Sequence, residues 1–377
     1  MADIHRRRVV LAPDKFKGTL TAREVAEAML RGVPADIEAD VVPVADGGDG
    51  SVYAAITAGW QPGTLPTVDA WGDRQETPVA VSGRAAIAEV ASICGLGARK
   101  PTAQDAARAS SYGVGMVLHG LVTRGFNEIT LGLGGSATTD AGTGMLRALG
   151  VRLLDAHGRD VFGDSRALTS VTGVDGLEQA TRLLDGVQLT LACDVDTPMV
   201  GSDGSAEMFA AQKGADEPTI HQLSEALRHV ADVLEPAFGV RGVCREPGSG
   251  AAGGLGWAGM LLGGKVTSGA RTFLELLGAA DKIAHADVVV TGEGRLDRQT
   301  LRGKAPYVVA EHARNHGVPC VAVVGHSSLP GSAPGPFDEV VAIDRADPKC
   351  IDDLDLARKL IADATGSLLS RHLSSSR

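Results

Sequence analysis

The sequence predicts an α/β protein of two domains, in which one domain is split by the insertion of the other. Its 377 residues, 44% of them hydrophobic, exceed the size at which a single core stops growing. Both ends of the chain alternate strand-like and helix-like segments, as parallel sheets do. The middle instead begins with short β-like segments between tight turns. We therefore expect a discontinuous α/β domain at 1–66 and 276–377, and an inserted α/β domain at 67–275.

The first domain begins with a βαβ pattern. The apolar run 9–12 predicts a strand, and Thr21 with Glu24 three residues later is typical of a capping box, opening a helix that runs toward Gly32. The segment 38–45 predicts a second strand. Because a helix separates these strands, we expect them to be parallel, with ligand-binding loops at their carboxyl ends.

The inserted domain is expected to follow a stretch rich in glycine and proline at 59–66, which we take as the first boundary. Turns of the Gly-Asp and Ser-Gly-Arg types predict hairpins between 67 and 90. Thr102 with Asp105 then opens a helix. Further predicted strands are 127–133, 187–194, 286–294 and 318–325, and further predicted helices are 143–150, 218–238 and 300–316.

Charge and cysteine usage exclude several classes of protein. The chain has 46 acidic and 36 basic residues, a net charge of −10, which disfavours general binding to nucleic acid or anionic membranes. Five dispersed cysteines without a CxxC pair fit reduced thiols in the cytoplasm. The first apolar run stops at Pro13, short of a signal peptide, and no apolar stretch could span a bilayer. We expect a cytoplasmic protein with no nucleic-acid or membrane partner, and a homodimer is left open.

Glycine-rich turns follow several predicted strands. In the segment 131–150, Gly134, Gly135 and Ser136 come directly after a strand and before a helix. The backbone N–H groups of such a turn can bind phosphate, and a tight structural turn is the alternative. The turn lacks the closing Gly-Lys-Ser/Thr of a Walker A loop and the G-x-G-x-x-G spacing of a dinucleotide site.

Five strand-end loops combine glycine with an acid or a lysine, although each alone could be an ordinary turn or helix cap. They contain Asp14, Lys15 and Lys17; Asp46, Gly47, Gly48 and Asp49; Gly134 to Thr138; Asp194; and Glu293 with Asp297. Because the carboxyl ends of parallel strands converge, these groups are expected to meet. Carboxylates for Mg²⁺, lysines for phosphate oxygens and backbone cradles are the requirements of phosphoryl transfer.

Other chemistry is less well supported by the residues. His312 and His316 stand four apart on a predicted helix but lack the glutamate of the H-E-x-x-H motif, so we interpret them as surface histidines. Ser136 is not in the G-x-S-x-G turn that carries the nucleophile of many hydrolases, so a hydrolase site is not supported. Cys193 is better explained as a small core residue than as a nucleophile.

Taken together, the motifs resemble the bacterial glycerate kinase family, the one distinct from the MOFRL-type glycerate kinases. The resemblance runs through 9–325, and its motifs are 12–29, 43–51, 131–146, 192–201, 212–215, 247–256 and 291–306. It implies ATP- and Mg²⁺-dependent phosphorylation of D-glycerate, usually at the 2-hydroxyl. It also implies a Rossmann-like parallel α/β domain interrupted by a second α/β domain, with the active site in the interdomain cleft.

With this resemblance, residue type and context give each candidate a role. Asp194 and Asp297 are assigned as base or metal ligand, in an order that stays open, and Lys17 as a catalytic lysine. Lys17 and Lys213 are expected to contact glycerate carboxylate or phosphate, with Arg295 as the reserve. The remaining expected contacts are Asp46, Gly47 and Gly48 with substrate or metal, and Gly134, Gly135, Ser136 and Glu293 with nucleotide or phosphate.

Two alternatives from other classes stay open. An NAD(P)-dependent hydroxy-acid oxidoreductase would also use α/β domains, but should show a dinucleotide fingerprint that the first strand lacks. A non-catalytic regulator would bind a small acid without a base. The residues do not decide between the 2- and 3-hydroxyl, because one rotation of bound glycerate exchanges them.

Overall fold

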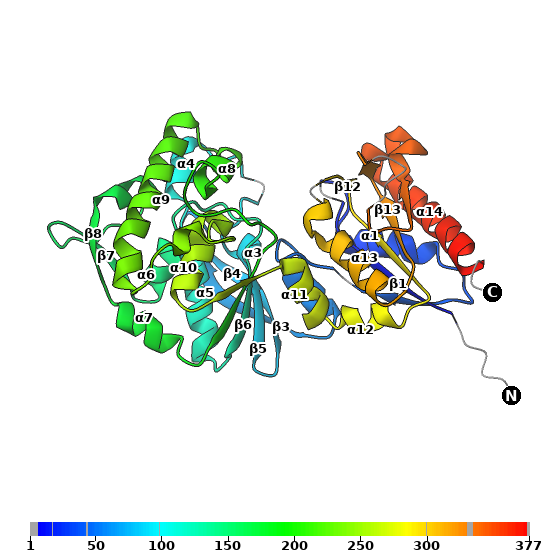
Figure 1. Cartoon of the computed structure of the whole chain (residues 1–377), viewed down its shortest axis with the longest axis horizontal. Helices are drawn as coiled ribbons and strands as arrows, with labels where there is room; N and C mark the ends of the chain where they lie inside the picture. The colour runs from blue at the N-terminus through cyan, green and yellow to red at the C-terminus, as the bar shows by residue number, and fades with distance from the viewer. Residues whose placement is uncertain are drawn as a thin grey trace. The chain divides into compact units, whose positions relative to one another are not determined.

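The computed structural model describes residues 7–16, 18–42, 44–97, 99–298, 300–329 and 335–374. Contacts divide the chain into two compact units (Figure 1): unit 1, Met1–Asp46 with Ala270–Arg377, and unit 2, Gly47–Gly269. Each unit contains a sheet with parallel strands and helices between them. The predicted α/β class is confirmed.

Unit 1 is built on a parallel sheet of five strands. Its strands are β1 (Arg8–Pro13), β2 (Glu38–Val41), β11 (Val288–Gly292), β13 (Cys320–Val324) and β15 (Glu339–Ala342), with a short pair, β12 (Arg295–Leu296) and β14 (His326–Ser327), beside them. Its helices are α1 (Ala22–Arg31), α11 (Gly269–Leu276), α12 (Ala279–Ala284), α13 (Ala305–Asn315) and α14 (Leu354–Ser374). The predicted capping box of Thr21 and Glu24 is present at α1.

The order of strands in this sheet reverses beside β1. From edge to edge the order is β15-β13-β11-β1-β2, and every neighbouring pair is parallel. The chain therefore moves one way from β1 to β2 and the other way from β11 to β13 and β15. Ligands of open parallel sheets bind at the carboxyl ends of the strands where the order reverses, which here is the gap between β1 and β11.

Both faces of the unit 1 sheet are covered by helices. Val9 and Leu11 of β1 pack on one face with α1 and α14, which lie side by side (Figure 1). Val10 and Ala12 pack on the other face, with residues of α11, α12 and α13. A strand covered on both faces requires a continuous apolar run, which is why 9–12 was recognisable as a strand.

Unit 2 contains a mixed sheet of six strands in the order β10-β9-β6-β5-β4-β3. These are β3 (Gln61–Val68), β4 (Arg74–Ser82), β5 (Ala85–Glu89), β6 (Glu128–Gly132), β9 (Gln188–Ala192) and β10 (Lys265–Thr267); β7 (Arg152–Asp155) pairs separately with β8 (Val171–Asp175). The helices are α2 (Ser51–Thr57), α3 (Val90–Cys94), α4 (Ala103–Arg108), α5 (Tyr112–Thr123), α6 (Thr143–Ala148), α7 (Leu177–Leu183), α8 (Ser205–Phe209), α9 (Glu217–Ala237) and α10 (Leu255–Leu261).

The stretch 59–66, expected to be a boundary, is largely strand β3. Pro62 and Pro66 are compatible with a strand because, among the described strands, β3 lies at the edge of its sheet and is hydrogen-bonded only to β4. The hairpins expected between 67 and 90 are confirmed, since β3, β4 and β5 are antiparallel neighbours.

Some other boundaries differ from the expectation. The second strand ends at Val41 rather than 45, and the helix expected at 300–316 is a 3-10 turn (Thr300–Arg302) followed by α13. The contact division at 46/47 and 269/270 differs from the predicted domain ends, and those ends stay a prediction. Within the part of the chain that is described, no helix is both long and apolar enough to cross a membrane.

Candidate active site

Two carboxylates lie at the reversal of strand order in unit 1. Asp14 directly follows β1, and Glu293 directly follows β11; the Asp14 N–H donates to Gly292 O at 2.8 Å, so the two strand ends are joined here. Asp46, at the end of unit 1, is close enough for its charge to act on Asp14. The structure therefore brings together the loops after β1, β2 and β11, as parallel strand ends are expected to do.

Both carboxylates are harder to ionise than ordinary ones. Burial raises the pKa of Asp14 to about 6, with a further increase from the Asp46 charge, against the opposing effect of Lys15 and Lys304. Burial also raises the pKa of Glu293 to about 7, opposed by a Thr300 hydrogen bond and by Lys304. A perturbed carboxyl pair at a ligand-binding edge is typical of a functional site.

Arg295 begins strand β12, two residues after Glu293, and Asp297 directly follows that strand. The Asp297 N–H donates to Thr300 Oγ1 at 3.2 Å, and the Thr300 N–H donates to Asp297 Oδ1 at 3.3 Å, which fixes the turn. Arg295 lies 4.0 Å from the Asp297 carboxylate, and its side chain is 70% exposed. The Arg295 side chain is thus accessible from solvent, and its predicted contact with substrate stays a prediction. Lys17, predicted for the same site, lies outside the described residues.

In unit 2, the glycines of two loops pack backbone against backbone. The Gly134 N–H donates to Gly47 O at 2.9 Å. A Cβ on Gly134 would lie 2.6 Å from Gly48 Cα, and a Cβ on Gly132 would lie 2.4 Å from Gly47 O. Gly47 itself has a φ of +82°, which favours glycine. These glycines are needed for the crossing of two chain segments, a reason distinct from phosphate binding.

The side chain of Lys213 is buried against the glycine-rich turn. Its Nζ donates to Ser136 Oγ at 2.9 Å and to Thr138 O at 2.6 Å, and the residue is 4% exposed. Burial lowers the pKa of Lys213 to about 8, although the Cys94 and Asp140 charges oppose this shift. Lys213 therefore fixes the turn. Its predicted contact with glycerate carboxylate or phosphate stays a prediction.

Replacing Lys213 with methionine is expected to flatten the pH dependence of stability. The folded-state pKa of about 8 lies below the ordinary 10.5, so between these values the unfolded chain binds the proton that the native state has lost. Native stability must then rise with pH over that window, and Lys213→Met removes the rise. Urea unfolding at pH 8, 9 and 10 measures it, with the exposed Lys265 of β10 changed to methionine as the control. Equal slopes in Lys213→Met and the parent would contradict the expectation.

Asp194 lies two residues after the end of strand β9, at the same sheet edge as the glycine-rich turn. It is half-buried, and the Ser268 hydroxyl, after the parallel neighbour β10, donates to Asp194 Oδ1 at 3.0 Å. Leu133, next to the turn, donates from its N–H to Ala192 O at 3.0 Å. Neighbouring Cys193 is buried, and burial raises its pKa to about 11, which agrees with a core residue.

Two buried carboxylates in unit 2 were not identified from sequence. Glu89, the last residue of β5, accepts the Val52 N–H at 3.0 Å and also bonds the N–H groups of Gly50 and Ser51, at the start of α2. Asp140 accepts the N–H and hydroxyl of Ser111, each at 2.8 Å. An acid that ends the apolar run 85–90 is the only signal that could have indicated Glu89.

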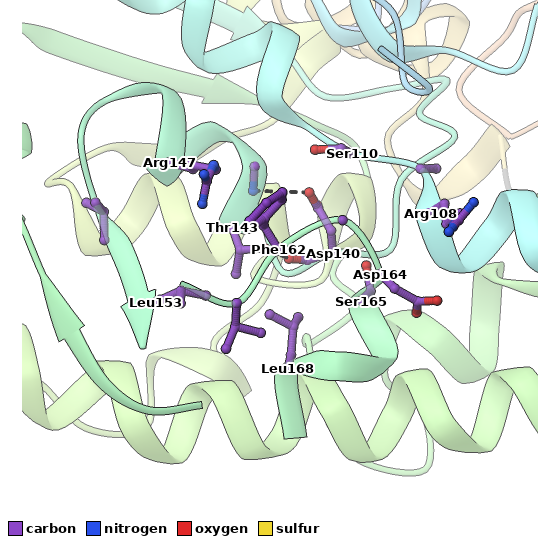
Figure 2. Close-up of a pocket in the computed structure, with 15 residues that line it drawn as sticks. Arg108, Ser110, Asp140, Thr143, Arg147, Leu153, Phe162, Asp164, Ser165 and Leu168 are labelled. Carbon is purple, nitrogen blue, oxygen red and sulfur yellow. Dashed lines mark hydrogen bonds between the residues drawn. The ribbon is translucent and has the colours of Figure 1, made fainter. Parts of the chain in front are cut away.

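A cavity in unit 2 lies apart from these strand ends. Figure 2 shows Arg108 and Arg147 on opposite sides of Thr143, with Leu153 and Leu168 among the apolar lining. Arg147, in the last turn of α6, pairs with Asp160 at 2.7 Å. None of the sequence-predicted site residues that the structure describes lines this cavity.

Comparison with known proteins gives concordant matches. Residues 9–370 match the model of the glycerate kinase family. A glycerate kinase from Halalkalibacterium halodurans is 37% identical over 325 residues, covering 84% of this chain and 85% of that protein. A glycerate 2-kinase from Escherichia coli K12 is 37% identical over 331 residues, covering 84% and 85%. A Salmonella typhimurium LT2 crystal structure, assigned as glycerate kinase 2, superposes with a TM-score of 0.84 at 31% identity, covering 98% and 99%.

Proposed function

Because this chain belongs to the glycerate kinase family and phosphorylates glycerate with ATP, we propose that it converts D-glycerate to 2-phosphoglycerate. The observation that carries the proposal is the family match over 9–370, which includes every strand-end loop considered above. The name of the Escherichia coli relative, glycerate 2-kinase, supports transfer to the 2-hydroxyl.

The phosphate groups are proposed to contact the turn of Gly134, Gly135 and Ser136. The buried ammonium of Lys213 supports this, because it brings a positive charge to Ser136 Oγ at 2.9 Å. Backbone N–H groups and a lysine are the usual partners of transferring phosphate. Lys17 and the exposed Arg295 are proposed for the glycerate carboxylate or phosphate, and Asp46, Gly47 and Gly48 for the substrate or metal.

Asp194 and Asp297 are proposed to act in the transfer as base or metal ligand. Among the described residues, no group of three or more His, Cys, Asp or Glu could hold a metal ion. Mg²⁺ in phosphoryl-transfer sites is held by one or two carboxylates together with phosphate oxygens and water. When bound, Mg²⁺ would neutralise charge on the phosphates. The two aspartates are suited to it as half-buried oxygen donors at strand ends.

A cytoplasmic location is part of the proposal. Its support is that Cys94, Cys193, Cys244, Cys320 and Cys350 are all buried and form no disulfide, as in reducing compartments. A homodimer and an active site shared by the two predicted domains stay predictions.

The experiment that tests the function is ADP release from the purified chain. We expect release that requires both D-glycerate and Mg²⁺, stops on addition of EDTA, and is absent with L-glycerate. Phosphorus NMR of the product against authentic standards distinguishes 2- from 3-phosphoglycerate. Reduction of NAD(P) by D-glycerate would favour the oxidoreductase alternative, and D-glycerate binding without ADP release would favour a regulator.

A further inference from the structure

One oxygen of a buried carboxylate at the reversal in strand order has no hydrogen-bond partner among the described residues. Glu293 is only 6% exposed, and its Oε1 is buried and unpartnered. Its other oxygen is left to accept the hydroxyl of Thr300, a residue that is itself fully buried. Buried polar atoms without partners are rare and costly, so this oxygen is suited to a donor that a ligand supplies.

The charges around Glu293 identify the kind of donor. Asp14 after β1 and Asp297 after β12 are close enough to disfavour its ionised form, and Lys304, the residue before α13, opposes them. Asp14 in turn faces Asp46, Lys15 and Lys304. A buried oxygen beside other carboxylates repels a phosphate group, so the assignment of Glu293 to nucleotide phosphate is not favoured here. A ligand hydroxyl, which is uncharged and can donate a hydrogen bond to Glu293 Oε1, is favoured instead.

We infer that Glu293 is the general base of the phosphoryl transfer, with Asp14 as the neighbouring carboxyl that tunes it. The inference rests on the proposed function. Glu293 Oε1 accepts the proton of the attacking glycerate hydroxyl while that oxygen forms its bond to the γ-phosphorus of ATP. The bond from this phosphorus to the bridging oxygen breaks, and its electron pair leaves with ADP. The role left to Asp194 and Asp297 is that of a metal ligand.

The raised pKa of Glu293, about 7, supports this role, because a base is most effective when its pKa lies near the working pH. It also has a cost. A carboxyl whose folded-state pKa lies above its ordinary value loses native stability as the pH rises through about 7. The ionised Glu293 should therefore lower native stability and raise kcat. A residue with a purely structural role would not show both effects.

The first test is Glu293→Gln, assayed for kcat by ADP release and for Tm at pH 8. We expect kcat to fall by at least about a hundredfold, while Tm stays equal or rises because the ionisation cost is removed. The matched control is Glu339→Gln. Glu339 is the first residue of β15, at the amino end of a strand in the same unit, and its carboxylate pairs with Arg371. The kcat of this variant should change less than twofold. A kcat of Glu293→Gln within threefold of the parent would overturn the inference.

The second test holds if Glu293→Gln fails to fold. Asp14→Asn removes a charge that raises the pKa of Glu293, and Thr300→Val removes a hydrogen bond that lowers it. The acid limb of kcat/KM, expected near pH 7 in the parent, should move to lower pH in Asp14→Asn and to higher pH in Thr300→Val. If the acid limb of kcat/KM kept the parent's pH in both variants, the inference would be overturned. Absence of ADP release by the parent itself would instead refute the proposed function, so the two failures are distinguishable.

Discussion

Asp194→Asn is expected to lower kcat by at least about a hundredfold, which is about 2.7 kcal/mol of transition-state stabilisation. Asp194 lies at the carboxyl end of β9, beside the glycine-rich turn, and is oriented by the Ser268 hydroxyl at 3.0 Å. An asparagine keeps the size of the side chain and can still accept that hydrogen bond, but it is a poor ligand for Mg²⁺, the role left to Asp194. Steady-state ADP release at saturating ATP and D-glycerate measures the effect.

The control for this variant is Asp196→Asn, two residues further along the same loop. Asp196 is exposed, so the same chemical change should leave kcat within twofold of the parent. If Asp194→Asn retained the parent's kcat, the assignment of Asp194 to the transfer would have to be abandoned. An equal loss in both variants would indicate that the loop, and not the carboxylate of Asp194, is what matters.

Gly134→Ala is expected to destabilise the protein by about 3 kcal/mol. The added Cβ would lie 2.6 Å from Gly48 Cα and 3.1 Å from Gly48 N, and backbone atoms cannot move aside as a flexible side chain can. The two loops would have to separate, which breaks the bond from the Gly134 N–H to Gly47 O. Urea unfolding followed by circular dichroism measures the loss, and kcat should fall with it because Ser136 moves.

Gly173→Ala provides the comparison for this glycine. Gly173 lies in β8, and a Cβ there would meet no heavy atom within 4 Å. The same substitution should therefore change the free energy of unfolding by less than about 0.5 kcal/mol. A similar, small effect at Gly134 would show that the two loops can part without cost, and the backbone crossing would then not be a constraint on sequence.

Local signals in the sequence predicted most of the fold. The capping boxes of Thr21 and Thr102 are present at α1 and α4, because such a box depends on residues only three positions apart. The apolar run 9–12 became a fully buried strand, since a strand covered on both faces must be apolar throughout. Strand β3 was missed because its prolines are excluded only from central strands, and edge position is a property of the whole sheet.

The candidate site was predictable as a set of residue types, and less so as a geometry. Strand-end loops with acids and glycines could be recognised, because their position depends on the strand that precedes them. Partners far apart in sequence could not. Glu89 bonds Val52 at the start of α2, 37 positions away in the sequence, and Lys213 bonds Ser136, 77 positions away. No local pattern records that Gly134 packs on Gly48, since both are ordinary glycines of loops.

The arrangement of the first sheet also bears on how the chain is made. Strand β1 is hydrogen-bonded to β11, and the Thr291 hydroxyl reaches Ala12 O across 279 residues. Unit 2, in contrast, is a continuous segment that ends at Gly269. A ribosome releases the chain from its N-terminus, and domains fold as they emerge. Strand β1 therefore stays without its β11 partner until unit 2 has been synthesised, and its unpaired edge is open to aggregation during that time.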